Sequence, residues 1–263
     1  MMRLVFSVML LCCSLAACTQ QIFQRDGQYE LAWQEDFNGK SIDAASWTKI
    51  ARVPYPWGRH MSDNSSLYRV RSGYLRLYAR RNNRLEPTDT AKYITGGISS
   101  QGKRHITYGK VEVRARIKGA QGTWPAIWLL VNRPCGTEDE RYSEIDIIEY
   151  INRDKFVYQT VHSSYTLHRN QNDKHSVTAQ INFEKWNTYA AEILPDEVIL
   201  SVNGIETFRY PRREGEKGQF PYGIESYLML DMQVGGDWVK TVDPKTFPAY
   251  MDIDWVKIYA LKR

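Results

Sequence analysis

Cysteine is scarce in this chain of 263 residues, and its placement excludes a disulfide framework. Cys12, Cys13 and Cys18 lie near the start, and only Cys135 lies in the rest of the sequence. A single cysteine has no intrachain partner, so we expect a fold without disulfides. No group of cysteines and histidines has the spacing of a zinc site either.

A block of basic charge is also missing, although the formal net charge is +5. The basic residues occur in scattered groups such as RRNNR, GKRH and YPRREGEK, and they form no stripe along one element. Proteins that bind nucleic acids concentrate such residues on one face. We therefore expect no nucleic-acid partner and only a mild preference for anionic ligands.

Long hydrophobic runs are absent apart from one at the N-terminus, which extends from Leu4 to Leu15. This run follows Arg3 and is too short to span a membrane, which is typical of a secretory signal. The sequence LAAC at 15–18 resembles the bacterial lipobox, in which the cysteine is lipidated and becomes the first residue of the mature protein. The alternative is an ordinary secretory signal with an incidental cysteine.

The lipobox resemblance implies a lipoprotein of a Gram-negative cell envelope, with residues 1–17 as its signal peptide. Residues 18–28 would then form a tether, lipidated at Cys18, that holds the protein at the outer membrane on the cell surface or on the periplasmic side. The remaining residues, 29–263, are expected to form one domain.

Helical periodicity is almost absent, whereas alternation with a period of two recurs from Tyr29 onwards. The segment KVEVRARIKG, residues 110–119, alternates between apolar and charged side chains, which predicts a strand with one buried face. Ser72-Gly73 and Asn203-Gly204 separate further alternating segments and predict tight hairpin turns. Many short strands without intervening helices favour an antiparallel β-sandwich or barrel.

The segment SEIDIIEY, residues 143–150, combines three carboxylates with β-branched apolar residues. The β-branched residues favour a strand, and a helix with three isoleucines on one side is the alternative. On a strand Glu144 and Asp146 share a face, but strict alternation would bury Glu149 in the core. One extra residue in the strand, a β-bulge, would bring Glu149 back to the acidic face.

Three converging carboxylates repel one another, and this repulsion predicts how they titrate. Two unit charges about 5.5 Å apart repel by roughly 3 kcal/mol at an effective dielectric near 20, or about two pKa units. One acid is therefore expected to keep its proton near neutral pH, and we assign that proton to Glu149. A protonated acid beside an ionised one is what a retaining glycosidase requires, whereas the alternative is a solvated acidic strand face.

The spacing in EIDIIE resembles the E-[IL]-D-x-x-E signature of glycoside hydrolase family 16, the group of laminarinases and related endo-β-glycanases. The run from Tyr93 to Leu130 resembles the laminarinase-type segment that ends in G-x-W-P-A-x-W. DMQVGGDW and MDIDWVKIY resemble late strands of that group, so the similarity covers about residues 30–261. It implies an all-β fold, a concanavalin A-like β-jelly-roll sandwich of two curved antiparallel sheets with an open substrate cleft.

The resemblance also implies a role for each acid. Glu144 aligns with the nucleophile that forms a covalent glycosyl-enzyme, and Glu149 with the general acid/base. Asp146 would hydrogen-bond Glu144 and share its charge.

Further residues match the family's substrate groove. Trp124 and Trp128 match tryptophans that stack against sugars on the non-reducing side of the cut. His162 matches a histidine of the neighbouring strand that faces the acids, from which it could donate to Glu149 or to a substrate hydroxyl. Laminarinases continue that strand with Trp-Gly, whereas Ser163 and Ser164 follow here, which puts β-glucan specificity in doubt.

A loop before the first hairpin offers a second groove wall, with Trp57 and Asn64 as its candidate substrate contacts. No catalytic cofactor is expected. The resemblance allows a structural Ca²⁺ held by Asp36, the carbonyl oxygen of Gly73 and Asp254, with an ion-pair or hydrogen-bond role for these groups as the alternative.

These residues together predict an endo-acting, retaining hydrolase of an extracellular β-linked polysaccharide or oligosaccharide. A laminarinase-like β-glucan endohydrolase, acting on β-1,3 or β-1,3/1,4 linkages, is the first candidate. An endo-β-galactosidase acting on mucin O-glycans, keratan or galactans is the second. A non-catalytic carbohydrate-binding lipoprotein and a transglycosylase are the alternatives. We expect a monomer whose contact with the membrane is the lipid at Cys18.

Overall fold

The structure, a computed structural model, describes residues 27–83, 85 and 88–262. The expected signal peptide, the lipidation site Cys18 and the tether up to residue 26 lie outside the described residues. None of the helices in the described part is both long enough and apolar enough to cross a membrane.

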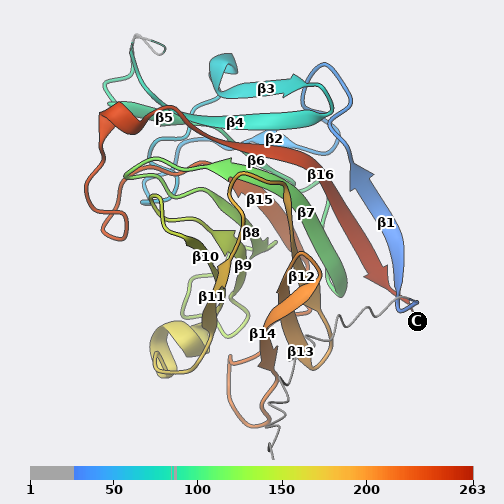
Figure 1. Cartoon of the computed structure of the whole chain (residues 1–263). Helices are drawn as coiled ribbons and strands as arrows, with labels where there is room; N and C mark the ends of the chain where they lie inside the picture. The colour runs from blue at the N-terminus through green and yellow to red at the C-terminus, as the bar shows by residue number, and fades with distance from the viewer. Residues whose placement is uncertain (1–26, 84, 86–87, 263) are drawn as a thin grey trace, which may run out of the picture.

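Two antiparallel sheets lie one on the other, as Figure 1 shows. The nine-stranded sheet contains β1 (Tyr29–Glu35), β3 (Tyr68–Arg71), β4 (Tyr74–Arg81), β5 (Tyr93–Thr95), β7 (Gly109–Lys118), β12 (Asn187–Ile193), β13 (Glu197–Val202), β14 (Ile205–Pro211) and β16 (Ala249–Leu261). The seven-stranded sheet contains β2 (Thr48–Lys49), β6 (Gly97–Ser99), β8 (Ala126–Val131), β9 (Ser143–Glu149), β10 (Phe156–Ser163), β11 (Ser176–Gln180) and β15 (Ser226–Asp231). Three short helices complete the described elements: η1 (Ser65–Leu67), η2 (Tyr165–Arg169) and η3 (Pro244–Thr246).

The predicted alternation is clearest in β7, where every second residue from Gly109 to Ile117 is buried. Both predicted hairpins form, between β3 and β4 and between β13 and β14. Each turn requires two residues with positive φ, and Asn203 (53°) and Gly204 (77°) provide them in the second hairpin. The prediction of a jelly-roll sandwich is therefore confirmed.

Strand β9 lies in the middle of its sheet, between β8 and β10. Its residues Ile145 and Ile147 are buried in the main hydrophobic core, which fills the space between the sheets. Because this inner face is anchored by apolar burial, the opposite face of β9 is fixed in position. That face carries the acids predicted from the sequence.

Candidate active site

The predicted β-bulge is present in β9. Glu144 lies opposite Leu130 of β8 and Asp146 opposite Trp128, two residues further along both strands. From Asp146 to Glu149, however, β9 advances three residues while β8 advances only two, to Ala126. The register against β10 shifts over the same residues. The extra residue returns Glu149 to the face of Glu144 and Asp146, and all three line one cleft.

This cleft has a volume of about 570 Å³ and lies over the seven-stranded sheet. Its acids come from β9, and its aromatic walls are formed by Tyr55, Trp57, Trp124, Trp128 and Tyr142. Such walls offer flat apolar surfaces to the C–H faces of sugar rings. The cleft thus combines aromatic stacking surfaces with a row of carboxyl groups.

Burial is the main reason why two of the acids hold their protons. Glu149 is 6 % exposed, and the loss of water raises its pKa well above the usual value, with the charge of Asp146 adding to the rise. The indole N–H of Trp124 opposes this rise because it donates to Glu149 Oε1 at 2.7 Å. Burial also raises the pKa of Asp146, and the charges of Glu144 and Asp231 raise it further. The sequence identified the repulsion, but desolvation is the larger cause.

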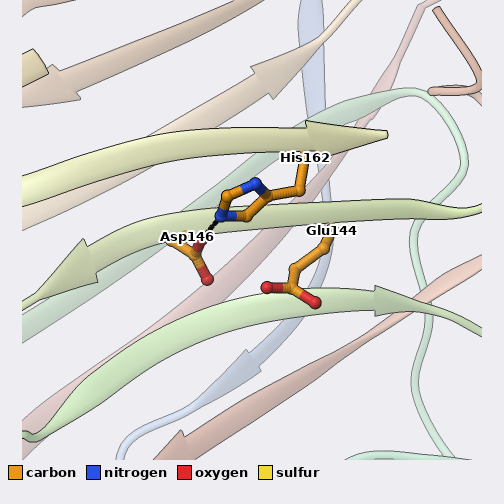
Figure 2. Close-up of side chains that lie close together, drawn as sticks. All are labelled: Glu144, Asp146 and His162. Atoms are coloured by element: carbon orange, nitrogen blue, oxygen red, sulfur yellow. Dashed lines mark ion pairs between the residues drawn. The ribbon is translucent and has the colours of Figure 1, made fainter. Parts of the chain in front are cut away.

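His162 reaches the acids from β10, as predicted, but its partner is Asp146. Its Nε2 lies 3.3 Å from Asp146 Oδ2, and Figure 2 shows the ring turned toward that carboxyl group with Glu144 beside it. Glu144, Asp146 and His162 offer ligand atoms that all lie within 4.8 Å of one another, so this cluster has the donor set of a metal site. The same oxygens are the ones that a glycosidase uses directly, so cation binding here would compete with catalysis.

Both groove tryptophans line the cleft, and Trp57 joins them. The ring of Trp57 packs edge-on against Trp128, with 5.2 Å between centroids, so the loop before η1 forms a second wall as expected. Trp128 is 5 % exposed, and its indole N–H donates to Asp231 Oδ2 at 2.8 Å.

The prediction that Asn64 contacts substrate is contradicted by the structure. Asn64 is not one of the residues that line the cleft. Its Oδ1 accepts from the backbone N–H of Ser66 as the N-cap of η1, and its Nδ2 donates to the carbonyl oxygen of Leu85 at 2.8 Å. Asparagine is a preferred helix N-cap, and this local role occupies the side chain.

Three residues of the site were missed by sequence reasoning. Tyr142 donates its hydroxyl to Glu144 Oε2, and Asp231 accepts from both Trp128 and Gln233. Asp231 is fully buried, and desolvation raises its pKa to about 7 against the two N–H donors. The position of Tyr142, two residues before Glu144 and so on the same strand face, was a usable signal. For Asp231 and Gln233 no comparable signal was available.

The residues suggested for a structural Ca²⁺ do not fit a cation site as they stand. The carboxylate of Asp254 is paired with the guanidinium of Arg114, and that positive charge would oppose a cation at the same oxygens. Asp36 accepts from Gln34 Nε2 on both of its oxygens. The ion-pair and hydrogen-bond alternative describes these two residues.

A cleft on a β-sandwich that carries buried carboxyl groups with raised pKa values among tryptophans is the arrangement expected of a glycoside hydrolase. The sequence profile of Glycosyl hydrolases family 16 matches residues 61–257, and the chain belongs to this family. The predicted family is confirmed, and the described domain is that of an endo-acting β-glycosidase.

Two characterised relatives are each 30 % identical to the chain. One is a keratan-sulfate endo-1,4-beta-galactosidase of Sphingobacterium multivorum, aligned over 89 % of this chain and 56 % of its own length. The other is a beta-glucanase of Rhodothermus marinus, aligned over 88 % and 85 %. The chain thus spans little more than half of the first relative.

A solved structure agrees with this placement. The laminarinase from Rhodothermus marinus superimposes with a TM-score of 0.79 at 27 % identity, covering 89 % of this chain and 98 % of that one.

Proposed function

We propose that this protein is a retaining, endo-acting β-glycoside hydrolase that cleaves internal linkages of an extracellular glycan. The observation that carries the proposal is the bulge between Asp146 and Glu149. It places Glu149 on the same strand face as Glu144 and Asp146, so that all three acids line the cleft. Neither a binding module nor a structural sandwich requires buried carboxyl groups with raised pKa values at the floor of a sugar-sized cleft.

In the first chemical step, Glu149 acts as the acid. Its raised pKa keeps the proton available, and that proton passes to the glycosidic oxygen as the bond to the anomeric carbon breaks. Glu144 attacks the same carbon from the opposite face and forms the glycosyl ester. Tyr142 holds Glu144 Oε2, which leaves Oε1 as the attacking oxygen.

In the second step, Glu149 acts as the base. Now a carboxylate, it takes a proton from water while the water oxygen attacks the anomeric carbon and the bond to Glu144 breaks. The Trp124 N–H, which donates to Glu149, stabilises this charged form. Two inversions at one carbon retain the β configuration.

Two substrate classes are supported by different observations. The beta-glucanase and laminarinase relatives favour a β-glucan, the first candidate. The keratan-sulfate relative and the sequence after His162 favour a β-galactoside. Ser163 ends β10 and Ser164 is the N-cap of η2, and both are buried, so no side chain there covers the cleft as an indole would. A glucoside and a galactoside differ in the direction of one hydroxyl group, which a few contacts can distinguish.

The test uses Glu144→Gln beside the wild-type chain on a panel of laminarin, mixed-linkage glucan, agarose-type galactan, keratan and mucin O-glycans. We expect wild-type protein to release an internal ladder of products from one class, read by mass spectrometry. The variant should lose turnover by a factor of about 10⁴ or more and still bind that glycan. Unchanged turnover in the variant would remove Glu144 from its role, and products longer than the substrate would identify transglycosylation.

We also propose that the protein is held at the Gram-negative envelope through a lipid on Cys18. The support is the LAAC sequence that ends the apolar N-terminal run. Cys18→Ser should move the protein from the membrane fraction to the soluble fraction of expressing cells. An unchanged membrane fraction would contradict lipidation.

A further inference from the structure

A second cavity, of about 680 Å³, shares no residue with the catalytic cleft. Four parts of the chain come together around it. They are the end of β7 with Lys118, the turn after β9 with Tyr150, the segment before β12 with Phe183, and η3 with Thr246. Tyr150 directly follows Glu149, so the cavity and the cleft are adjacent along the chain.

The charge of this cavity is opposite to that of the cleft. Its cationic residues are Arg116, Lys118, Arg153 and Lys245, and its one acid is the exposed Glu184. The catalytic cleft, in contrast, is lined by three acids and by no lysine or arginine. Four positive charges around one opening produce a local potential that attracts anions.

Three of these cations are not neutralised within the fold. Arg116 donates to the buried Asp252 at 2.8 Å, which offsets its charge. Lys118, Arg153 and Lys245 form no ion pair with any acid in the described part of the chain. Lys118 Nζ instead lies 5.7 Å from the ring centroid of Tyr250, a contact that leaves the ammonium group free for a ligand.

The walls between the cations suit a sugar ring better than a bare ion. Phe183 and Tyr250 are half-buried and line the cavity; Phe183 is held against Tyr150 with 4.5 Å between centroids, and Arg76 lies over the ring of Tyr250 with its Cζ 3.8 Å from the centroid. Aromatic faces bind the C–H faces of pyranoses, and flanking ammonium and guanidinium groups bind anionic substituents. A flat membrane surface would use the rim cations but not these recessed rings.

We propose that this cavity binds an anionic sugar residue, one carrying a sulfate ester or a carboxylate, at a site remote from the scissile bond. The inference rests on the proposed function, because it assumes that the glycan cleaved in the catalytic cleft also carries anionic sugar residues. The cavity binds these residues while the cleft cleaves the chain. Binding uses the charges of Lys118, Arg153 and Lys245 and the rings of Phe183 and Tyr250. Chains bearing such residues are held at the enzyme between successive cuts, whereas neutral fragments are released.

The experiment compares the wild-type chain with a triple variant, Lys118→Gln, Arg153→Gln and Lys245→Gln. A matched control, Lys40→Gln, Lys217→Gln and Lys262→Gln, removes the same charge from exposed lysines outside both cavities. Binding of N-acetylglucosamine 6-sulfate, glucuronic acid, neutral N-acetylglucosamine and inorganic sulfate is measured by titration calorimetry. Thermal unfolding checks that all three proteins are folded.

We expect at least one of the two anionic sugars to bind at least tenfold more tightly than the neutral sugar and than inorganic sulfate. Which of them binds distinguishes a sulfate site from a carboxylate site. The pocket variant should lose this binding by about tenfold or more, and the control should keep it. Equal binding of inorganic sulfate, or equal loss in the control, would reduce the effect to net charge and overturn the proposal.

Two further measurements separate this inference from its neighbours. Vesicles of phosphatidylglycerol in phosphatidylcholine test a lipid headgroup, and binding to them alone would overturn a sugar site. The pocket variant should cleave a neutral oligosaccharide from the substrate panel with unchanged kcat/KM. If neither the wild type nor any variant cleaves a glycan, the proposed function fails. The calorimetry would still show whether the cavity binds an anionic sugar.

Discussion

The two sheets each bury carboxyl groups, but they treat them in opposite ways. On the nine-stranded sheet, Asp252 of β16 is fully buried. Its carboxyl oxygens accept hydrogen bonds from the guanidinium of Arg76, at 2.5 and 2.9 Å, and from that of Arg116, at 2.8 Å. On the seven-stranded sheet, Asp146 and Asp231 are similarly buried, yet no lysine or arginine of the described residues pairs with either.

The difference separates structural acids from reactive ones. A carboxyl group that pairs with two guanidinium groups holds together the strands that carry the three side chains. An acid surrounded by indole, amide and imidazole groups instead retains its proton, because burial is not offset by a cation and raises the pKa. Burial alone therefore does not define the active site; burial without a cationic partner does.

The largest expected effect comes from replacing one buried Asp by Asn in each of the two sheets and comparing the two variants. Asp252→Asn leaves Arg76 and Arg116 without their shared anion, so we expect the free energy of unfolding to fall by about 3 kcal/mol with kcat unchanged. Asp146→Asn removes a buried acid that has no lysine or arginine partner, so stability should hold while kcat falls by roughly 100-fold.

Urea unfolding measures the free energy of unfolding of both variants, and steady-state kinetics measure their kcat. Asn is close to Asp in shape, so changes in packing are small in both places. If Asp252→Asn is as stable as wild type, or if Asp146→Asn is the less stable of the two, the contrast between the sheets is wrong.

A smaller effect concerns the pH dependence of stability. The pKa of Asp231 is about 7 in the folded chain against an ordinary value of 3.8, so folding retains a proton that the unfolded chain releases. The contribution of this group is therefore full below pH 3.8 and is lost as the pH rises through about 7. Asp231→Asn should make stability between about pH 5 and 7 less dependent on pH, by up to about 1.4 kcal/mol per pH unit.

Calorimetric Tm values at several pH values test this prediction, with Asp252→Asn as the comparison. A slope identical to that of the wild type would mean that Asp231 is ionised in the folded protein.

The smallest effect sharpens the role of the missed tyrosine. Tyr142 donates to Glu144 in the free enzyme, and burial raises the pKa of the phenol, so that it remains a donor throughout. Its bond to a carboxylate is stronger than its bond to the neutral ester, so it assists the departure of Glu144 in the second step. Tyr142→Phe should slow that step about tenfold.

An aryl glycoside of the preferred sugar reveals this effect as a burst of phenol before the steady state. We expect kcat and KM to fall together while kcat/KM remains near the wild-type value. A fall in kcat/KM without a burst would indicate a structural role for Tyr142 instead.

Local rules were sufficient to predict the strands and the acidic face from the sequence. Period-two alternation identified the strands, and the misfit of Glu149 within that alternation required a bulge, which is present. The sequence could not predict contacts that depend on the register of distant strands, such as Trp128 with Asp231. The Asn64 prediction failed for the opposite reason, because a local capping signal, Asn-Ser-Ser, was overlooked.

The extra residue in β9 makes the chemistry depend on strand pairing as well as on residue identity. The same residues paired without the bulge would retain every acid and every tryptophan of the cleft, yet the carboxyl group of Glu149 would turn inward, against the isoleucines of the core. A strand shortened by one position between Asp146 and Glu149 would need no bulge, because regular alternation would then keep all three acids on one face. The pairing of this strand with its neighbours is therefore as consequential as the identity of its acids, although a comparison of composition alone would not detect it.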